Sequence, residues 1–428
     1  MLILVTACVA VYYPIFFNDF LYYWDDQWVL MNRYTEGGLN FRNLWAILTN
    51  YYHGQYAPVN EYFYLIQHTL FGYNPMMFHL TSLLVHIGCV CLTYTVITRI
   101  VAQVKDAKTE STHLIAFAAS LLFAVHPMNV ESVAWVSASK ILLYAFFYLA
   151  ATYTYIIYME RKRTGFYVLT LLLFTLSFGA KEQAVTFPVW LLMLYWICGY
   201  SFKDRKIWLH VTPFLALAIF FGVITMLSQA AAGGGALSKA IQYPLWQRFI
   251  LGCYTFFEYF SKFLFPYKLL HVYPFPTLIN EPLHEWMMLY PVLLFIMITA
   301  LWRYITKMPL AAGLMFFFVH IAIVLHIIPI SRYAIIADRY IYVASIGLAF
   351  LVAWYFTWLI TNCKGLIRNA VTGAFVCIVL SLGIYSNFRS RKWKDTESIK
   401  RDLREIIKQR NDHVPEFEEL MKEEIINN

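Results

Sequence analysis

Residues 77–100 read MFHLTSLLVHIGCVCLTYTVITRI, an apolar run in which Arg99, near the end, is the one charged side chain. An α-helix needs about 20 mostly apolar residues to cross the roughly 30 Å of hydrocarbon in a bilayer, and it pairs its backbone groups within itself. This stretch therefore predicts a membrane-spanning helix. Similar runs recur along the 428 residues, of which 60% are hydrophobic and 14% charged, against roughly half and a quarter in soluble domains. The sequence predicts an all-α integral membrane protein.

Twelve segments carry this pattern and predict a bundle of eleven or twelve transmembrane helices. They are Leu2–Phe17, Met77–Ile100, Leu114–Val125, Ile141–Tyr158, Phe166–Phe178, Ala184–Ile197, Ile207–Leu227, Phe249–Phe265, Met287–Trp302, Pro309–Ile328, Tyr340–Ile360 and Ile367–Tyr385. The first segment lacks a basic n-region and a small-residue cleavage site. We therefore expect it to be a retained span and not a removable signal peptide.

Short loops rich in Lys and Arg set the expected orientation, because such loops stay in the cytoplasm. The clusters are Arg99/Lys105/Lys108, Arg161/Lys162/Arg163, Lys203/Arg205/Lys206, Arg303/Lys307 and Lys364/Arg368. Placing them all inside puts residues 18–76, 126–140 and 329–339 and the C-terminus outside. It also requires that Phe249–Phe265, which carries Glu258 and Lys262, does not cross. We expect that segment to lie along the interface or to re-enter, and the alternative that it spans stays open.

The chain divides into two expected parts. Residues 1–388 form a transmembrane domain whose first outer loop, residues 18–76, is long enough to carry function. Within this loop, the spacing of apolar residues in Val59–Phe71 predicts an amphipathic helix on the membrane surface. Residues 389–428 are polar and predict a short helical hairpin, fewer units than the three or so that a repeat array needs. Its apolar positions are Ile399, Leu403, Ile406 and Ile407, then Val414, Phe417, Leu420, Met421 and Ile425.

Several functional classes lack support in the sequence. The net charge of +8 is scattered between apolar blocks, so we expect no nucleic-acid partner. The seven cysteines form no CxxC pair, and we interpret them as packing residues. Neither a Gly-rich phosphate loop, a nucleophile elbow nor an H-E-x-x-H motif occurs, which leaves soluble nucleotide-sugar chemistry without a motif.

Charged side chains recur at the outer ends of the expected helices, where acids and bases at one depth outline a polar cavity. They are Asp25, Asp26, His126, Glu131, Lys140, Lys181, Glu182, Arg332, Asp338 and Arg339. Three pairs among them have a structural alternative. Asp25 and Asp26 could form a solvated pair, Lys181 and Glu182 an ion pair between helices, and Asp338 and Arg339 a helix-start pair.

Six stretches resemble, in order and spacing, the GT-C membrane glycosyltransferases, over about residues 16–395. The resemblance is to bacterial relatives of the protein O-mannosyltransferases and to the eukaryotic transmembrane-and-TPR O-mannosyltransferases. The stretches are FFNDFLYYWDD (16–26), GYNPMMFHLTSLLVH (72–86), LLFAVHPMNVESVAW (121–135), AKEQAVTFPVWLL (180–192), IIADRYIYVASIGL (335–348) and RKWKDTESI (391–399).

The resemblance implies a GT-C bundle in residues 1–388 and a catalytic site on the extracytoplasmic face of a bacterial inner membrane. The donor would be a sugar on a polyprenyl phosphate in the membrane lipid, and the acceptor a hydroxyl of a protein or glycan, reached by an inverting displacement. Asp25 would be the general base with Asp26 beside it, and Lys181 and Arg339 would hold the donor phosphate. Further substrate contacts would come from His126, Glu131, Lys140, Glu182 and Asp338. No cofactor is implied, and a divalent metal stays open.

This chain departs from that family at several positions. Ala57 stands where Arg or His is common before the proline, residues 139–141 read Ser-Lys-Ile where Arg-Lys-Asp is expected, and Ser82 replaces Asn. The sugar and the acceptor are therefore open. Two alternatives to an enzyme also remain, a flippase of lipid-linked sugars and a non-catalytic scaffold for surface-glycan assembly. The flippase has less support, because no paired Gly/Pro-broken segments occur in two halves of the chain.

Overall fold

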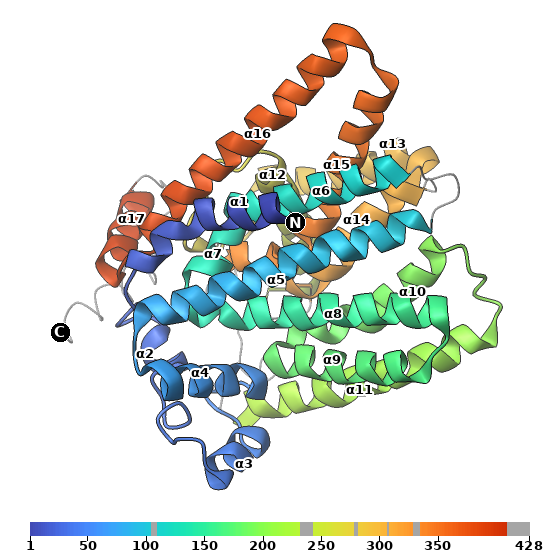
Figure 1. Ribbon diagram of the computed structural model, residues 1–428. Helices are drawn as coiled ribbons and strands as arrows, with labels where there is room; N and C mark the ends of the chain where they lie inside the picture. The colour runs from blue at the N-terminus through green and yellow to red at the C-terminus, as the bar shows by residue number, and fades with distance from the viewer. Residues whose placement is uncertain (104–108, 232–242, 278–280, 306–307, 328–333, 409–428) are drawn as a thin grey trace.

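The computed structural model describes residues 1–428 except 104–108, 232–242, 278–280, 306–307, 328–333 and 409–428. The described chain is a bundle of α-helices (Figure 1). Its one sheet pairs two short antiparallel strands, β1 (Tyr273–Pro274) and β2 (Ala334–Ile336). The all-α prediction is confirmed.

Six helices in the described part are long and apolar enough to cross a membrane, and a bent pair would make a seventh. The six are α5 (Pro75–Ala102), η3 with α8 (Val136–Ala138, Ser139–Arg161), α11 (Arg205–Ala231), η5 with α13 (Glu285–Met288, Leu289–Ile305), α15 (Ser345–Asn362) and α16 (Gly365–Lys392). The pair is α6 (Thr109–Val125) with η2 and α7 (Pro127–Asn129, Val130–Ala134), bent by 54°. The protein is a multi-pass membrane protein.

Other helices account for the remaining apolar segments. They are α1 with η1 (Leu2–Tyr12, Tyr13–Phe17), α9 (Thr164–Ala180), η4 with α10 (Glu182–Thr186, Phe187–Ile197), α12 (Leu245–Leu264) and α14 with η6 (Met308–Ile321, Ala322–Val324). Each of the twelve expected segments thus contains helix in its described residues. The number of crossings stays a prediction. So does the path of α12, which carries Arg248, Glu258 and Lys262 and is not among the six.

α5 shows how the sequence starts a spanning helix. The Asn74 side chain accepts a hydrogen bond from the backbone N–H of Met77, and Pro75 occupies the first turn. Both are favoured at a helix start, where backbone N–H groups lack partners within the helix. The 28 residues of α5 rise about 42 Å at 1.5 Å per residue, which is enough to cross the hydrocarbon core with some tilt.

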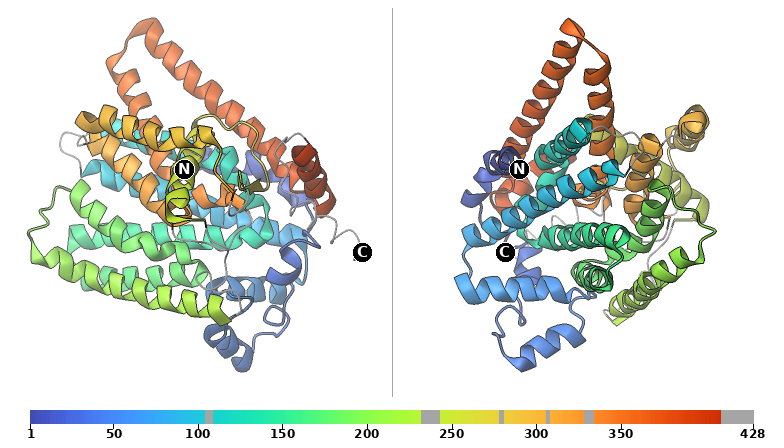
Figure 2. Two further views of the ribbon diagram at one scale, coloured as in Figure 1. Left: turned by 180° about the vertical axis from the view of Figure 1, so that it is seen from behind. Right: turned by 45° about the vertical axis from the view of Figure 1, so that its right-hand side comes forward.

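Three of the basic clusters, those that contain Arg99, Lys162 and Arg205, meet at one end of the bundle, which we call the basic end. Arg99 of α5 forms an ion pair with Glu160 of α8 at 2.8 Å. The Lys162 ammonium lies 5.8 Å from the ring centroid of Tyr200, in the loop after α10. Figures 1 and 2 show the α8–α9 and α10–α11 turns together, opposite α2, α3 and α4. Lys105, Lys108 and Lys307 lie outside the described residues.

The first loop covers the opposite end, which we call the loop end. It contains α2 (Asp26–Val29), α3 (Phe41–Thr49) and α4 (Pro58–Phe71), so the helix predicted for Val59–Phe71 is confirmed, while its place on a membrane surface stays a prediction. α4 packs closely on α9, since a Cβ on Gly179 would lie 2.9 Å from a methyl group of Val59.

The segment that follows residue 388 is tied to the first loop. α16 continues to Lys392, and α17 (Thr396–Lys408) follows. The Asn18 amide donates to the Ser390 carbonyl at 3.0 Å, and the backbone N–H of Asp19 donates to the Lys394 carbonyl at 2.7 Å. The second helix of the predicted hairpin, with Val414–Ile425, lies outside the described residues, so the hairpin stays a prediction.

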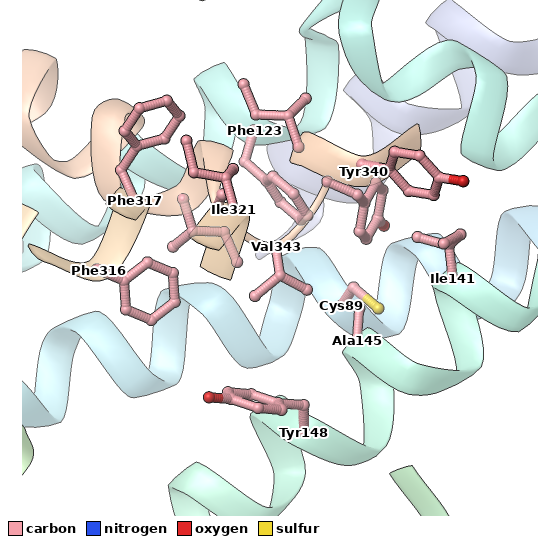
Figure 3. Packing of buried hydrophobic residues seen from close by; sticks show 14 of the residues in the cluster. Cys89, Phe123, Ile141, Ala145, Tyr148, Phe316, Phe317, Ile321, Tyr340 and Val343 are labelled. Atoms are coloured by element: carbon pink, nitrogen blue, oxygen red, sulfur yellow. The ribbon is translucent and has the colours of Figure 1, made fainter. Parts of the chain in front are cut away.

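Close packing in the core fixes the segment before α15, which includes η7 (Asp338–Ile341). Tyr340 and Val343 lie among side chains of α5, α6, α8 and α14 (Figure 3). α14 and α15 cross at two glycines, where a Cβ on Gly347 would come 2.6 Å from the Gly313 carbonyl oxygen and 3.0 Å from the Phe317 nitrogen. Because both are backbone atoms, a larger residue there would push the helices apart. The crossing therefore sets how deeply residues 338–343 lie within the helix bundle.

The shared location of the basic clusters leads to a labelling test. Thr164 is exposed at the basic end, and Asn50 is exposed in the first loop. If the basic end is cytoplasmic, a membrane-impermeant maleimide on intact cells labels Asn50→Cys and leaves Thr164→Cys at the background of the native cysteines. Permeabilising the cells restores labelling at residue 164. Labelling of Thr164→Cys in intact cells would reverse the orientation.

Candidate functional site

Asp26 is a buried anchor between the first loop and the start of α8. Its side chain has no exposed surface. One carboxylate oxygen accepts a hydrogen bond from the backbone N–H of Leu21 at 2.8 Å. The other accepts from the Ser137 N–H at 3.1 Å and from the Ser137 hydroxyl. Burial raises the pKa of Asp26 to about 6, against the lowering by these hydrogen bonds. The hydrogen bonds of the Asp26 carboxylate described here are thus all made to groups of the protein itself.

Asp25 is placed differently from its neighbour. It is partly exposed at the start of α2, and one carboxylate oxygen accepts a hydrogen bond from the indole N–H of Trp28 at 3.2 Å. Because that bond occupies one oxygen, the carboxylate is oriented and still accessible. The structure thus separates the two predicted acids into one accessible and one enclosed group.

Arg339 and Glu131 form the charged centre of the loop end. Glu131, on α7, is 1% exposed, and its carboxylate accepts from the backbone N–H of Arg339 at 2.9 Å and from the guanidinium. The Arg339 side chain is 21% exposed, so part of it is accessible to solvent. Burial lowers the pKa of Arg339, but Glu131, helped by Tyr340 and Asp25, outweighs it and raises the pKa above its ordinary value. Asp25 is thus close enough to act on Arg339.

Lys181 approaches the same centre from α9. Its side chain is 3% exposed, and its ammonium lies 3.3 Å from the Glu182 carboxylate, whose side chain is 43% exposed. The ammonium also lies 5.7 Å from the centroid of the Tyr340 ring, and the Arg339 guanidinium lies 5.0 Å from the same centroid. The two cations expected to share a cavity therefore share one aromatic neighbour.

Asp338 turns away from this centre. Its carboxylate is fully buried, pairs with Arg389 of α16 at 2.9 Å and accepts from the Tyr273 hydroxyl at 2.9 Å. Arg389 also donates to the Leu269 carbonyl at 2.7 Å. Asp338 and Arg339 do not pair with each other. Instead they join the 338–341 turn to two different parts of the bundle.

His126 occupies a packed position between backbone groups. Its ring stacks on Phe263 at 4.4 Å. One ring nitrogen lies 2.9 Å from the Phe263 carbonyl, and the other accepts from the Met128 N–H at 3.3 Å. Both nitrogens are engaged, so we assign His126 no direct substrate contact in the proposals below.

Lys140 connects α8 with the first loop. Its ammonium donates to the Gln55 side-chain oxygen at 3.1 Å.

Glu61 of α4, which the sequence analysis did not identify, accepts a hydrogen bond from the Asn32 amide at 3.2 Å. Burial raises the pKa of Glu61 to about 7, although the Asn32 hydrogen bond and the charge of Lys140 lower it. In the sequence of an amphipathic helix, a partly buried acid has the same pattern of neighbours as an exposed acid. The sequence therefore did not indicate that Glu61 is partly buried.

The structure therefore gathers Asp25, Arg339, Glu131 and Lys181 at the loop end, where Lys140 of α8 contacts the first loop through Gln55. Asp26 and His126 are held by internal contacts, and Asp338 belongs to a separate ion pair. Arg332 lies outside the described residues. In the part of the chain that the structure describes, no group of three or more His, Cys, Asp or Glu residues could hold a metal ion.

Sequence comparisons agree with the resemblance. No family model matches the chain, and no solved structure matches it. It is 27% identical over 198 residues to the Caenorhabditis elegans protein O-mannosyl-transferase F38B6.6, which covers 44% of this chain and 27% of the relative. It is similar to two human relatives, protein O-mannosyl-transferase TMTC1 (27% identity, 38% of this chain, 20% of the relative) and TMTC4 (30%, 35% and 22%).

The similarity to the TMTC O-mannosyl-transferases is thus confirmed. The matched part spans about a quarter or less of each relative's length. These relatives are animal proteins, so the bacterial inner membrane that we expected stays a prediction.

The different placement of the two acids predicts different effects on stability. Asp26→Ala leaves three buried donors without their acceptor and should lower the free energy of unfolding by at least about 2 kcal/mol, since each such group costs about 1–3 kcal/mol. Asp25→Ala removes one partly exposed acceptor and should cost less than about 1 kcal/mol. Thermal unfolding of the purified proteins in detergent measures both. Equal melting temperatures for the two variants would show that Asp26 is not an anchor.

The raised pKa of Glu61 predicts a pH dependence of stability. Between its ordinary value of 4.5 and about 7, the folded protein binds more protons at this site than the unfolded chain, so stability falls as pH rises through that window. Glu61→Gln cannot titrate there. The melting temperature of Glu61→Gln relative to wild type should therefore rise between pH 4.5 and 7 and level off above. A constant difference across that range would exclude the pKa shift.

Proposed function

We propose that this chain is a membrane glycosyltransferase that moves a sugar from a polyprenyl-phosphate donor to an extracytoplasmic hydroxyl, with Asp25 as general base. The relatives it resembles are named protein O-mannosyl-transferases. A hexose as the transferred sugar and a protein hydroxyl as one acceptor class follow from those names as part of the proposal.

One observation carries the proposal: the accessible and oriented carboxylate of Asp25 lies at the end of the bundle that also carries Arg339 and Lys181. The indole of Trp28 directs one oxygen of Asp25. Arg339 is near enough for Asp25 to act on its pKa, and Lys181 shares the Tyr340 ring with Arg339. A base needs access to the proton it removes, and a phosphate leaving group needs more than one cationic or N–H donor. Asp25 meets the first requirement, and Arg339 and Lys181 are the candidates for the second.

The reaction is a single displacement at the anomeric carbon. Asp25 takes the proton of the acceptor hydroxyl as its oxygen forms a bond to that carbon. The bond from the carbon to the phosphate oxygen breaks, and the electron pair leaves with the polyprenyl phosphate. The configuration at the anomeric carbon inverts. The protein's contribution is to position the two substrates and to stabilise the developing charge.

The cations differ in how free they are to hold the phosphate. Arg339 forms an ion pair with Glu131, and 21% of its side chain is exposed. In this proposal it both stabilises the fold and contacts the substrate. Removing it would leave the buried Glu131 carboxylate without its partner, which is strongly destabilising. Lys181 pairs with the more exposed Glu182, so its removal leaves no buried bare charge. We propose that both cations face the donor phosphate.

A flippase and a scaffold differ from this enzyme in what the purified protein does. An enzyme consumes a lipid-linked sugar, by transfer or by slow hydrolysis. A flippase moves the lipid across a liposome bilayer and leaves it chemically intact, and a scaffold does neither. Mass spectrometry of lipids and surface glycans from a deletion strain would then identify the donor that accumulates and the product that is lost.

The base role predicts a specific loss on Asp25→Asn. The amide keeps the shape and can still accept from Trp28, but it cannot take a proton, so turnover of the lipid-linked donor should fall at least roughly 100-fold with folding retained. Asp19→Asn is the matched control, because Asp19 is an exposed acid in the same loop. Among the described residues, its side chain accepts a hydrogen bond only from the Phe20 N–H. Near wild-type turnover by Asp25→Asn would remove Asp25 from the mechanism.

A further inference from the structure

An open pocket lies between the last turn of α16 and α17, which follow each other at the loop end (Figure 1). Its volume is about 230 Å³, whereas one water molecule needs roughly 10–15 Å³ of such space. The lining side chains are Arg391 and Lys392 of α16 and Ser398, Arg401 and Glu405 of α17. Because three of these five are cationic, we call it the cationic pocket. It has room for a phosphate group.

One face of α17 supplies its side of the pocket. Ser398, Arg401 and Glu405 are three and four residues apart, a spacing that places them on the same side of a helix. Ile399 is 1% exposed and packs in the main hydrophobic core. The buried Ile399 holds α17 against the bundle, while Arg401 and Glu405 are exposed. The position of the polar face is thus set by packing and does not depend on a ligand.

Arg391 supplies the other side of the pocket. Its Nη2 donates to the Tyr13 hydroxyl at 3.3 Å and to the Asn387 side-chain oxygen at 3.1 Å. A guanidinium has five N–H donors in a planar fork, so these two bonds leave donors for a ligand. Glu405 is the one carboxylate among the lining side chains, and with three cations the pocket has a net positive charge. Its ligand should be an anion with several acceptor oxygens, such as phosphate.

The pocket lies directly beyond a row of exposed apolar side chains on α16. These side chains stand four residues apart, so they share one side of a helix that is long and apolar enough to cross a membrane. They are Val376, Leu380, Ile384 and Phe388. Lys392 continues the same spacing, and Arg391 precedes it. Cationic side chains at the end of a spanning helix reach the headgroup level of the bilayer. A membrane lipid whose chains lie along this row can therefore place its phosphate in the pocket.

The same segment contacts the candidate functional site on its other side. Trp393, buried between Lys392 and α17, stacks on Trp135 with the ring centroids 5.6 Å apart. The Arg339 guanidinium lies 5.2 Å from the centroid of the Trp135 ring. The pocket is therefore separated from the charged centre by two stacked indoles, and it offers a second set of cations.

We propose that the cationic pocket binds the phosphate of an anionic membrane lipid, with Arg391, Lys392 and Arg401 around the phosphate oxygens and the lipid chains along the apolar row of α16. The lipid is either a bilayer phospholipid or a polyprenyl phosphate, since both carry an anionic phosphate on long apolar chains. Neither the sequence analysis nor the names of the relatives assign a ligand to these residues. The proposal requires no glycosyl transfer and stands apart from the proposed function.

Native mass spectrometry of the purified protein, released from a non-ionic detergent, measures this binding directly. The probes are phosphatidylglycerol, undecaprenyl phosphate, zwitterionic phosphatidylcholine, diacylglycerol without a phosphate, and inorganic phosphate. We expect both anionic lipids to bind more tightly than phosphatidylcholine and diacylglycerol. Arg391→Gln combined with Arg401→Gln should weaken their binding on the order of 30-fold, about fivefold for each cation removed.

The matched control is Arg368→Gln combined with Arg404→Gln. It makes the same two changes on the same two helices, at exposed positions outside the pocket, and should leave lipid binding at the wild-type level. Arg401→Gln alone provides a variant that keeps the Arg391 contacts, in case the double variant fails to fold. An equal loss in the pocket and control variants would overturn the proposal. So would equal binding of phosphatidylcholine and phosphatidylglycerol, or binding of inorganic phosphate without either anionic lipid.

Two further arms separate the lipids and the two proposals. Tighter binding of undecaprenyl phosphate than of phosphatidylglycerol assigns the pocket to the sugar carrier, and equal or weaker binding assigns it to bilayer phospholipid. Asp25→Asn should lose turnover and keep lipid binding. Full turnover by Asp25→Asn would overturn the proposed base and leave the lipid site standing.

Discussion

Asp26 is a carboxylate with no exposed surface, and a buried carboxylate is tolerated only where donors surround it. Its donors come from Leu21 in the first loop and from Ser137 just before α8. These contacts hold the loop against the bundle at one fixed register. Asp25, one residue earlier, is partly exposed and reaches Trp28. The position of the candidate base thus depends on the enclosed acid beside it.

A second set of buried charges sets the far side of the site. Arg339 and Asp338 are adjacent in sequence, yet one pairs with Glu131 of α7 and the other with Arg389 of α16. The turn between β2 and α15 is therefore held by ion pairs to two different helices. The crossing of α14 and α15 at their glycines sets how deeply this turn lies within the bundle. Residues after 388 complete the arrangement through Ser390 and Lys394. The loop end is therefore built from distant parts of the chain.

The fold was predictable where its cause is local. A run such as residues 77–100 predicts a spanning helix because length and hydropathy suffice, and α4 was predictable from its apolar spacing. The site was predictable only as a set of polar residues at one end. Pairing depends on tertiary contacts, so the sequence did not separate Asp25 from Asp26 or Asp338 from Arg339. Arg389, assigned to a separate hairpin, and Glu61, on a half-polar helix, lacked any local sign of burial.

The central claim is that Asp25 acts on a sugar whose phosphate lies against Arg339 and Lys181. An experimental structure of the purified protein with a non-cleavable polyprenyl-phosphonate sugar tests it most directly. With one acceptor oxygen between them, the Asp25 carboxylate and the anomeric carbon should lie within about 6 Å, with the phosphonate touching both cations. An anomeric carbon more than about 10 Å from Asp25, or a phosphonate bound away from Arg339 and Lys181, would contradict the account.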